Sequence, residues 1–262
     1  VEVLDGNGQA AAFNGALDLT QFDTVENLET VYGGANDDVL TTPHGDFHFN
    51  GADGTDTLVL DGSVFDHQIT DEGLGVATIT RPDGSVITLE NVEKITFADY
   101  EWSLDGTGNG PATQADVAAV TEGGSVDVLA STLTANDRDV QDEAFEVTSV
   151  ESTGSLGVSL DAGTITVDAE STDFDALAAD EERDVTFNYT VTNARGGQTT
   201  QAVTVTVTGV NDGPVGVDDE FDITENAVAS GNVLSNDTDA DDGSTAAVTG
   251  LAGGTEDNGT FT

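Results

Sequence analysis

The sequence contains no cysteine and no methionine. The absence of cysteine rules out a disulfide framework and any thiol-based catalysis. Because methionine is absent, Val1 is not a translation start, and we expect the chain to be an interior piece of a longer polypeptide. No apolar run approaches the roughly 18 residues of a membrane span, and no signal peptide opens the chain.

Basic residues are also scarce: five Lys and Arg stand against 51 Asp and Glu, for a formal charge of -46. Such self-repulsion opposes a compact state unless counter-ions bind. Nucleic acid and anionic membrane surfaces are therefore poor partners. The charge fits an extracellular setting that is rich in calcium. The solvating surface of a halophilic protein is an alternative explanation, and the two are compatible.

Motifs of catalysis are missing as well. The chain has no Gly-x-Ser-x-Gly, no phosphate-binding loop and no His-Glu-x-x-His. Acidic residues are so frequent that paired carboxylates do not identify a glycosidase. The single tryptophan, Trp102, is predicted to be a core or capping residue, although an exposed indole could stack on a sugar. We expect no enzymatic activity in this chain.

Two nine-residue units are the most informative feature that is present. GGANDDVLT (33–41) and GADGTDTLV (51–59) both fit the calcium-binding pattern Gly-Gly-x-Gly-x-Asp-x-apolar-x, with one substitution each. Their sixth positions are Asp38 and Asp56. The unit between them, TPHGDFHFN (42–50), keeps the frame but has Phe47 in the place of the Asp. A metal is therefore expected on one side only.

Each unit predicts a tight turn followed by a short strand, so that two units close one coil and units eighteen residues apart stack. Stacked strands lie about 4.8 Å apart, which brings the turns that begin at Gly33 and Gly51 together. Two carboxylates about 5 Å apart repel by roughly 3 kcal/mol at an effective dielectric of about 20. A bound dication reverses that sign, and calcium accepts six to eight oxygen ligands, including backbone carbonyls.

These units resemble the RTX (hemolysin-type) calcium-binding repeats of proteins exported by bacterial type I secretion. The preceding VENLETVYGG (25–34) and the following NVEKITFADYEWSL (91–104) also look like the flanks of such repeats, the second as a capping strand. The resemblance covers roughly residues 1–106. It implies a short parallel β-roll with calcium as the ligand of its turns.

The rest of the chain contains an internal repeat of about 100 residues. Residues 110–150 align with residues 213–251: Pro111 and Pro214 are 103 positions apart, and Asn136 and Asn236 are 100 apart. That length is typical of one β-sandwich domain. Only the first half of a second copy follows Pro214, and this half would leave strand edges unpaired.

The complete copy is predicted to be almost entirely β. Residues 145–151 and 163–168 alternate apolar and polar side chains, and residues 185–193 pair with 200–208 across an Ala-Arg-Gly-Gly turn. Residues 76–89 form a hairpin around Pro-Asp-Gly. Residues 174–182 are the only segment that favours a helix, of about two turns.

This copy resembles the VCBS and cadherin-like repeats of bacterial surface adhesins. The segments FDALAADEERDVTFNYTVTN and VTVTVTGVNDGPV and the turns ANDRD and SNDTD are the basis of the resemblance. It implies calcium at domain junctions. The implied ligands of the second junction are Asn211, Asp212, Glu225, Asp237 and Asp239, and those of the first are Glu122, Asp137 and Asp139. The first linker, DGTGNGP (105–111), lacks the Asp of VNDGP.

The two Asn-Asp turns also have a chemistry of their own. Their carboxylates are spaced so that a curled loop can aim several oxygens inward; they belong to Asp137, Asp139 and Asp142 in the first turn, and to Asp237, Asp239, Asp241 and Asp242 in the second. Neither turn is an EF-hand. The alternative is that side-chain to backbone hydrogen bonds merely reverse the chain.

Together these patterns predict an all-β chain: a β-roll module at 1–106, an Ig/cadherin-like sandwich at 107–212 and half of a second sandwich at 213–262. The predicted function is that of a calcium-binding structural or adhesive segment of a secreted or surface-displayed bacterial protein. Neighbouring copies, adjacent repeats and surface glycans are possible partners. Two alternatives stay open: a surface-layer or filament subunit completed by neighbouring chains, and the non-catalytic region of an exported hydrolase.

Overall fold

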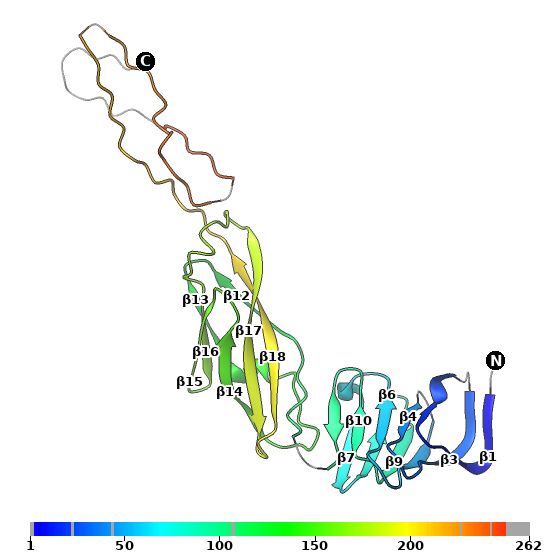
Figure 1. The fold of residues 1–262 in the computed structure, drawn as a ribbon. Coiled ribbons are helices and arrows are strands. Elements are labelled where there is room, and N and C mark those ends of the chain that lie inside the picture. Colours follow the sequence, from blue (N-terminus) through cyan, green and yellow to red (C-terminus); the bar gives the residue numbers. More distant parts are fainter. Residues whose placement is uncertain are drawn as a thin grey trace. The chain divides into compact units, whose positions relative to one another are not determined.

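The computed structural model describes residues 3–21, 24–42, 45–105, 108–225, 227–241 and 243–249. Its regular structure is nearly all β, which confirms the predicted fold class (Figure 1). The chain forms two compact units; the first comprises Val1–Ala115, Ala130–Ser149 and Tyr189–Gln201, and the second comprises Asp116–Leu129, Val150–Asn188 and Ala202–Thr262. Within the described residues, no helix has the length and apolar character needed to cross a membrane.

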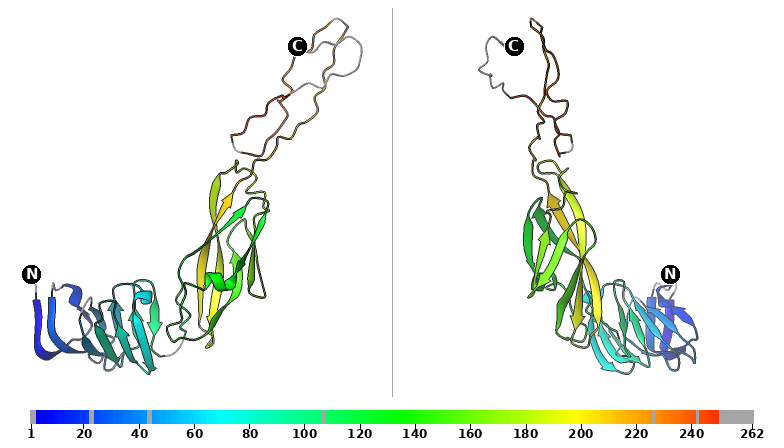
Figure 2. Two further views of the ribbon diagram at one scale, coloured as in Figure 1. Left: turned by 180° about the vertical axis from the view of Figure 1, so that it is seen from behind. Right: turned by 60° about the vertical axis from the view of Figure 1, so that its left-hand side comes forward.

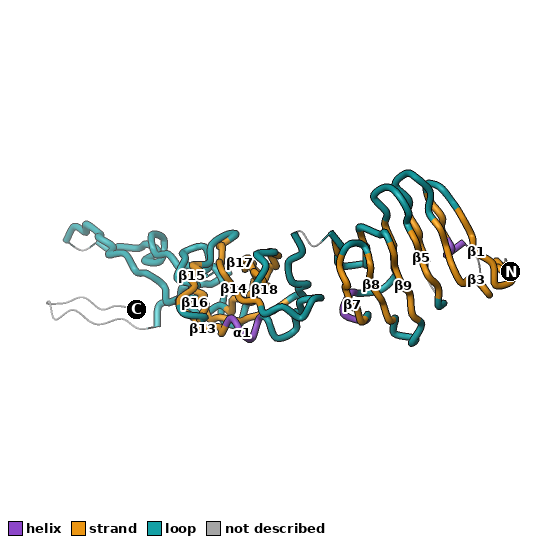
Figure 3. The backbone as a smooth tube through the Cα atoms, turned by 90° about the horizontal axis from the view of Figure 1, so that it is seen from below, coloured by secondary structure: helices purple, strands orange, loops and turns teal. Residues whose placement is uncertain are grey.

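The first unit contains a roll of two facing sheets, and Figure 3 shows the strands of the larger one side by side. The six-stranded sheet has the order β1 (Val3–Ala12), β3 (Thr24–Tyr32), β5 (Phe47–Asn50), β9 (Val86–Glu90), β8 (Val76–Thr80) and β7 (Gln68–Gly73). The five-stranded sheet has the order β11 (Glu101–Ser103), β10 (Lys94–Thr96), β6 (Thr57–Leu60), β4 (Val39–Thr42) and β2 (Ala16–Asp18). Two short 3-10 helices are η1 (Leu19–Gln21) and η2 (Val64–Asp66).

Successive strands β4, β5 and β6 alternate between the two sheets, and like strands pair in parallel. The apolar residue of each nine-residue unit therefore points between the sheets. Leu40, Phe49 and Leu58 are fully buried there. The parallel coil predicted from the spacing is present in the structure.

The roll is closed by the segments that the sequence identified as a hairpin and a cap. Strands β8 and β9 pair antiparallel, with Ile79 opposite Ile87. Strand β10 pairs in parallel with β6 and antiparallel with β11. Trp102 on β11 is fully buried in the roll core. Trp102 is therefore a core residue, and the sugar-stacking alternative for its indole is wrong.

Residues 110–208 form the sandwich. A four-stranded sheet has the order β12 (Asp116–Thr121), β18 (Gln198–Thr208), β17 (Glu182–Asn193) and β14 (Phe145–Ser152). A three-stranded sheet has the order β13 (Ser125–Leu129), β16 (Thr164–Asp168) and β15 (Gly157–Asp161). The alternation predicted for the long strands buries one face of each, and the fully buried residues are Ile165, Val167, Phe187, Tyr189, Val191, Val203, Val205 and Val207.

The helix predicted over residues 174–182 is wrong. The segment forms consecutive turns in which Leu177 N–H donates to Phe174 O and Glu181 N–H donates to Ala178 O. Phe174 and Leu177 are buried, and Asp180 has a φ of 64°, which no continuing helix allows. In the described part of the chain, the single α-helix is the four-residue α1 (Ala130–Leu133).

No strand is found among the described residues that follow Thr208. This segment runs as loops, visible in Figure 2 as a tube without arrows, with one isolated bridge between Val215 and Thr238. The same bridge joins Ala112 and Arg138 in the first copy. The offsets between the two bridges are those of the sequence alignment, 103 and 100 positions.

Candidate metal centre

The two nonapeptide turns stack at one edge of the roll. Strands β4 and β6 pair in register, with Val39 opposite Thr57, so that Asp38 and Asp56 occupy equivalent places in neighbouring coils. Thr57 N–H donates to Asp38 O at 2.8 Å, and Asp38 N–H donates to Asp56 Oδ1 at 2.8 Å. Both side chains are fully buried, with an exposed fraction of 0%.

Each acidic side chain accepts hydrogen bonds from the backbone of the preceding coil. Asp38 accepts from Gly15 N–H and also from Gly34 N–H of its own turn. Glu93 Oε2 accepts from Asp56 N–H at 2.7 Å. Asp38, Asp56 and Glu93 thus form a carboxylate ladder that runs along the stacked turns.

Glu93 is the residue that sequence reasoning missed. It lies in the capping segment, directly before β10, and β10 pairs with β6 so that Lys94 is opposite Thr57. The signal was present in the sequence, because Glu93-x-Ile95 repeats the spacing of Asp38-x-Leu40 with a glutamate in the place of the aspartate.

The second carboxylate oxygen of Asp56 is the unsatisfied atom of the ladder. Asp56 Oδ2 is buried and has no hydrogen-bond partner. Burial raises the pKa of Asp56 to about 6, and the negative charges of Glu93, Asp38 and Asp37 add to the rise, while the hydrogen bond from Asp38 N–H opposes it. A buried charged oxygen without a donor is costly, so this atom favours a proton or a cation beside it.

Backbone oxygens converge on the same carboxylates, and this is the reason for the two glycines. A Cβ at Gly33 would overlap Gly51 O and lie 2.6 Å from Asp38 Oδ2. A Cβ at Gly51 would overlap Asn91 O and Asp56 Oδ2. Glycine is needed because carbonyl and carboxylate oxygens crowd the place that a side chain would take.

The oxygens that crowd this edge are of the type that calcium accepts as ligands. Within the described residues, no group of three or more His, Cys, Asp or Glu side chains is arranged to hold a metal. The oxygens nearest to a cation at this edge would be Asp56 Oδ2 and the backbone carbonyls that crowd Gly33 and Gly51. Calcium tolerates such a mixed set of oxygen ligands, whereas magnesium requires a near-ideal octahedron.

The first Asn-Asp turn uses its carboxylates as hydrogen-bond acceptors. Asp139 is buried; its Oδ1 accepts from Gln141 N–H at 2.9 Å, and its Oδ2 accepts from Asn193 Nδ2 at 2.8 Å. Asp137 Oδ1 accepts from Gln114 N–H at 2.9 Å. Asp142 is exposed, with a φ of 55°. These contacts are those of a chain reversal, and metal binding at this turn stays a prediction.

The second Asn-Asp turn repeats this pattern. Asp237 Oδ1 accepts from Val217 N–H at 2.8 Å, as Asp137 accepts from Gln114. Asp239 Oδ1 accepts from Asp241 N–H at 3.1 Å. The two turns are therefore alike in their hydrogen bonds as well as in sequence. Asp242 lies outside the described residues.

Asp241 distinguishes the second turn from the first. It is 7% exposed, its Oδ2 accepts from Asp212 N–H at 2.9 Å, and its Oδ1 is buried without a partner. At the offsets of the alignment, Asp241 and Asp212 correspond to Gln141 and Asn109. The second junction thus has two carboxylates where the first has two neutral amides.

The remaining predicted ligands are placed as follows. Glu122 Oε2 accepts from Val210 N–H at 3.1 Å, because β12 and β18 are parallel and end together at Thr121 and Thr208. Glu122 therefore lies beside the second linker, although the alignment had grouped it with the first. Asn211 and Glu225 are exposed.

Comparison with known proteins identifies the sandwich. Residues 108–206 match the bacterial Ig domain family, which agrees with the predicted Ig-like part of the chain. No curated protein matches the chain.

Solved structures give only weak likenesses. Two structures of an endo-fucoidan hydrolase of glycoside hydrolase family 107 match, each over 53% of this chain and 19% of that one. One of them, a histidine variant, is 17% identical with a TM-score of 0.26. The other structure is 16% identical with a TM-score of 0.25. A nucleoside hydrolase-related protein from Saccharophagus degradans is 12% identical over 39% of this chain and 26% of that one, with a TM-score of 0.25. This chain spans about a fifth of the length of the fucoidan hydrolase.

Proposed function

We propose that the chain is a calcium-binding structural segment of a secreted or surface-displayed bacterial protein, in which calcium binding stabilises the roll. Bacterial Ig domains are typical of extracellular and surface proteins, and the sandwich matches that family. The observation that supports calcium most directly is Asp56 Oδ2, a buried carboxylate oxygen without a hydrogen-bond donor beside converging carbonyls.

The mechanism is folding coupled to metal binding. In the roll, Asp38, Asp56 and Glu93 order the stacked turns through backbone hydrogen bonds, and Gly33 and Gly51 let carbonyl oxygens approach. A calcium ion would neutralise the charge that burial disfavours. Weak extracellular-type sites fill at about millimolar calcium, so the acidic chain would stay expanded where calcium is scarce and fold where it is abundant.

Isothermal titration with calcium tests this proposal. We expect the wild-type protein to bind calcium, to bind magnesium at least ten times more weakly, and to lose the tightest calcium site in Asp56→Asn. Asp66→Asn is the matched control, because Asp66 is an exposed acid of the same roll. Wild-type protein that binds no calcium, or an Asp56→Asn variant with unchanged binding, contradicts the proposal.

A second candidate, assembly with neighbouring chains, is favoured by the apolar side chains of the incomplete copy. Ile223 is 62% exposed, whereas the aligned Val120 of the first copy is 7% exposed and lies on β12, which pairs with β18. Other large apolar side chains exposed in this segment are Val215, Val217, Phe221, Val228, Val233 and Val248. Light scattering in calcium tests the candidate: we expect oligomers, and a monodisperse monomer counts against it.

A further inference from the structure

The second edge of the roll has no aspartate of the nonapeptide type. In the unit at 42–50, Thr42 is first, Gly45 is fourth and Phe47 is sixth, where the units of the first edge have Asp38 and Asp56. Thr42 is nevertheless buried, with an exposed fraction of 1%. A backbone carbonyl buried at this edge takes a hydrogen-bond donor as its partner.

Arg81 is that partner. Its side chain is buried, with an exposed fraction of 4%. Arg81 Nη2 donates to Thr42 O at 3.1 Å, and Arg81 Nη1 donates to Gly45 O at 3.5 Å. One guanidinium thus donates to the first-position and fourth-position carbonyls of the same nine-residue unit. Arg81 comes directly after β8 and so belongs to the closing hairpin, not to the coil that it holds.

The exchange of aspartate for phenylalanine at the sixth position matches this arrangement. The guanidinium carbon of Arg81 lies 5.9 Å from the centroid of the Phe47 ring, within the range of a cation-π interaction. At the first edge, the first-position carbonyl of Gly51 lies near the Asp38 carboxylate. At the second edge, the corresponding carbonyl of Thr42 contacts a cationic side chain above an aromatic ring.

We propose that the Arg81 guanidinium is a built-in cation that holds the backbone carbonyls of Thr42 and Gly45 in the place of a metal ion. The two edges of the roll then differ: the first responds to calcium, and the second has a fixed charge and does not. The role of Arg81 rests on its own contacts, whereas the contrast between the edges rests also on the proposed function. Chelation is therefore expected to loosen the roll from the first edge.

The use of arginine toward carbonyl groups recurs elsewhere in this chain. Arg138 Nη1 donates to His67 O at 2.9 Å, and Arg183 Nη1 donates to Asp173 O at 2.6 Å. Three of the five basic residues, Arg81, Arg138 and Arg183, thus donate to backbone carbonyls. The other two basic residues, Lys94 and Arg195, pair with the carboxylates of Glu101 and Glu143.

Hydrogen exchange measured by mass spectrometry tests the proposal on the full chain. Arg81→Met keeps the length and apolar body of the side chain and removes its charge and donors. We expect peptides that cover 45–50 to exchange at least ten times faster in this variant, equally in calcium and in chelator, while peptides that cover 33–40 respond to calcium as in the wild type. Arg195→Met is the matched control, because Arg195 is an exposed partner of Glu143; it should leave 45–50 unchanged.

An Arg81→Met variant that protects residues 45–50 as well as the wild type overturns the proposal, because packing alone would then hold the turn. Arg81→Lys keeps the charge, but its single ammonium group can donate to only one of the two carbonyls. This variant replaces Arg81→Met in the experiment if the Met variant does not fold. We expect it to speed exchange at 45–50 at least threefold, and no increase overturns the proposal. If the exchange rate of wild-type peptides that cover 33–40 does not change with calcium, the calcium site is refuted, whereas the result for Arg81 still stands.

Discussion

The buried carboxylates have two roles that a sequence pattern does not separate. Asp38 and Asp56 are predicted from their spacing as metal ligands, and the structure shows them also as acceptors for backbone N–H groups. Asp38 has a donor on each oxygen, whereas Asp56 has one oxygen without a donor. The distinction lies in the turn itself: Gly34 N–H donates to Asp38, whereas the equivalent Ala52 N–H donates to Asn50 Oδ1 at 3.0 Å. It could be found only from the three-dimensional arrangement.

The pKa of Asp56 leads to a prediction about pH. Its value in the folded protein, about 6, is above that of an unfolded aspartate, so the folded state binds this proton more tightly. The stability that this proton contributes is full below about pH 4 and is lost as the pH rises to about 6, by at most roughly 3 kcal/mol.

In chelator, Asp56→Asn should therefore remove part of the fall in unfolding free energy between pH 4.5 and pH 7, because a neutral amide has no charge to bury. Urea unfolding at both pH values measures the slope, and Asp66→Asn is the control. Equal slopes in Asp56→Asn and wild type would show that the buried carboxyl does not titrate with a raised pKa.

The close approach at Gly51 gives a second prediction. In Gly51→Ala, the new Cβ would overlap Asn91 O and Asp56 Oδ2, so the backbone must shift. Overpacking of this kind costs about 1–3 kcal/mol, and calcium affinity should fall with it because both oxygens move. Gly154→Ala is the control, since nothing lies within 4 Å of its Cβ position. Thermal unfolding measures the stability of both variants. Equal melting temperatures of Gly51→Ala and Gly154→Ala would contradict the crowding at Gly51.

At the level of the elements, periodicity predicted the strands well. The apolar-polar alternation in β17 and β18 predicted which of their side chains face the core, and the structure confirms it. The spacing of eighteen residues predicted that the two nonapeptide units stack, and the register of β4 and β6 confirms that as well. The helix predicted at 174–182 failed because apolar residues three apart, Phe174 and Leu177, also fit two consecutive turns. Length and composition could not separate these possibilities.

Glu93 shows what the nonapeptide pattern leaves out. It ends the ladder from a capping segment that has no glycine turn, so a search for nonapeptides passes over it. Arg81 was missed for a similar reason: its carbonyl partners precede it by more than 35 residues, as the separation of 39 from Thr42 shows. Contacts between a coil and the hairpin that closes it are not encoded in local spacing.

The capping segment therefore has its own prediction. Glu93→Ala removes the acceptor of Asp56 N–H and should lower the unfolding free energy by about 1–3 kcal/mol, as for a buried donor left without a partner. Glu101→Ala is the control; it breaks an exposed pair with Lys94, worth about 0–1 kcal/mol. Chemical unfolding in calcium compares the two, and a Glu93→Ala variant no less stable than Glu101→Ala contradicts the ladder.

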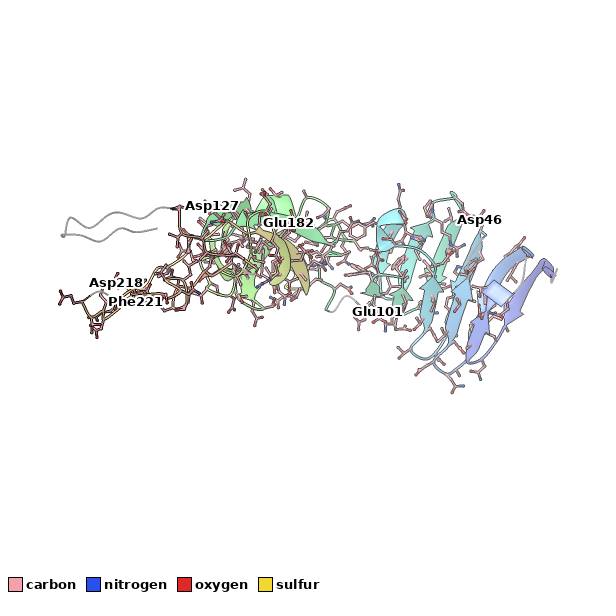
Figure 4. All side chains as sticks on the ribbon, turned by 90° about the horizontal axis from the view of Figure 1, so that it is seen from above. Asp46, Glu101, Asp127, Glu182, Asp218 and Phe221 are labelled. Carbon is pink, nitrogen blue, oxygen red and sulfur yellow. The ribbon has the colours of Figure 1, made fainter. Side chains whose placement is uncertain are left out.

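For the whole molecule, charge is the dominant constraint. Figure 4 labels exposed acidic side chains in each described part of the chain: Asp46 and Glu101 in the roll, Asp127 and Glu182 in the sandwich, and Asp218 in the segment that follows. Counter-ions must offset this repulsion for the compact state to persist. Part of any stabilisation by calcium will therefore be simple screening, and only a comparison at equal ionic strength separates it from binding.

The internal repeat was predictable from sequence, whereas the different exposure of its two copies was not. The offsets of 103 and 100 recur in the bridges between Ala112 and Arg138 and between Val215 and Thr238. Sequence alignment could not show that Ile223 is exposed, because the aligned Val120 lies on a paired strand, whereas the described residues after Thr208 contain no strand.

Thermal unfolding followed by circular dichroism, in about 5 mM calcium and in chelator at matched ionic strength, tests the central claim most directly. We predict a midpoint several degrees higher in calcium, a smaller effect of magnesium, and loss of most of the difference in Asp56→Asn. Superimposable melting curves in calcium and in chelator would contradict a role for calcium in folding this chain.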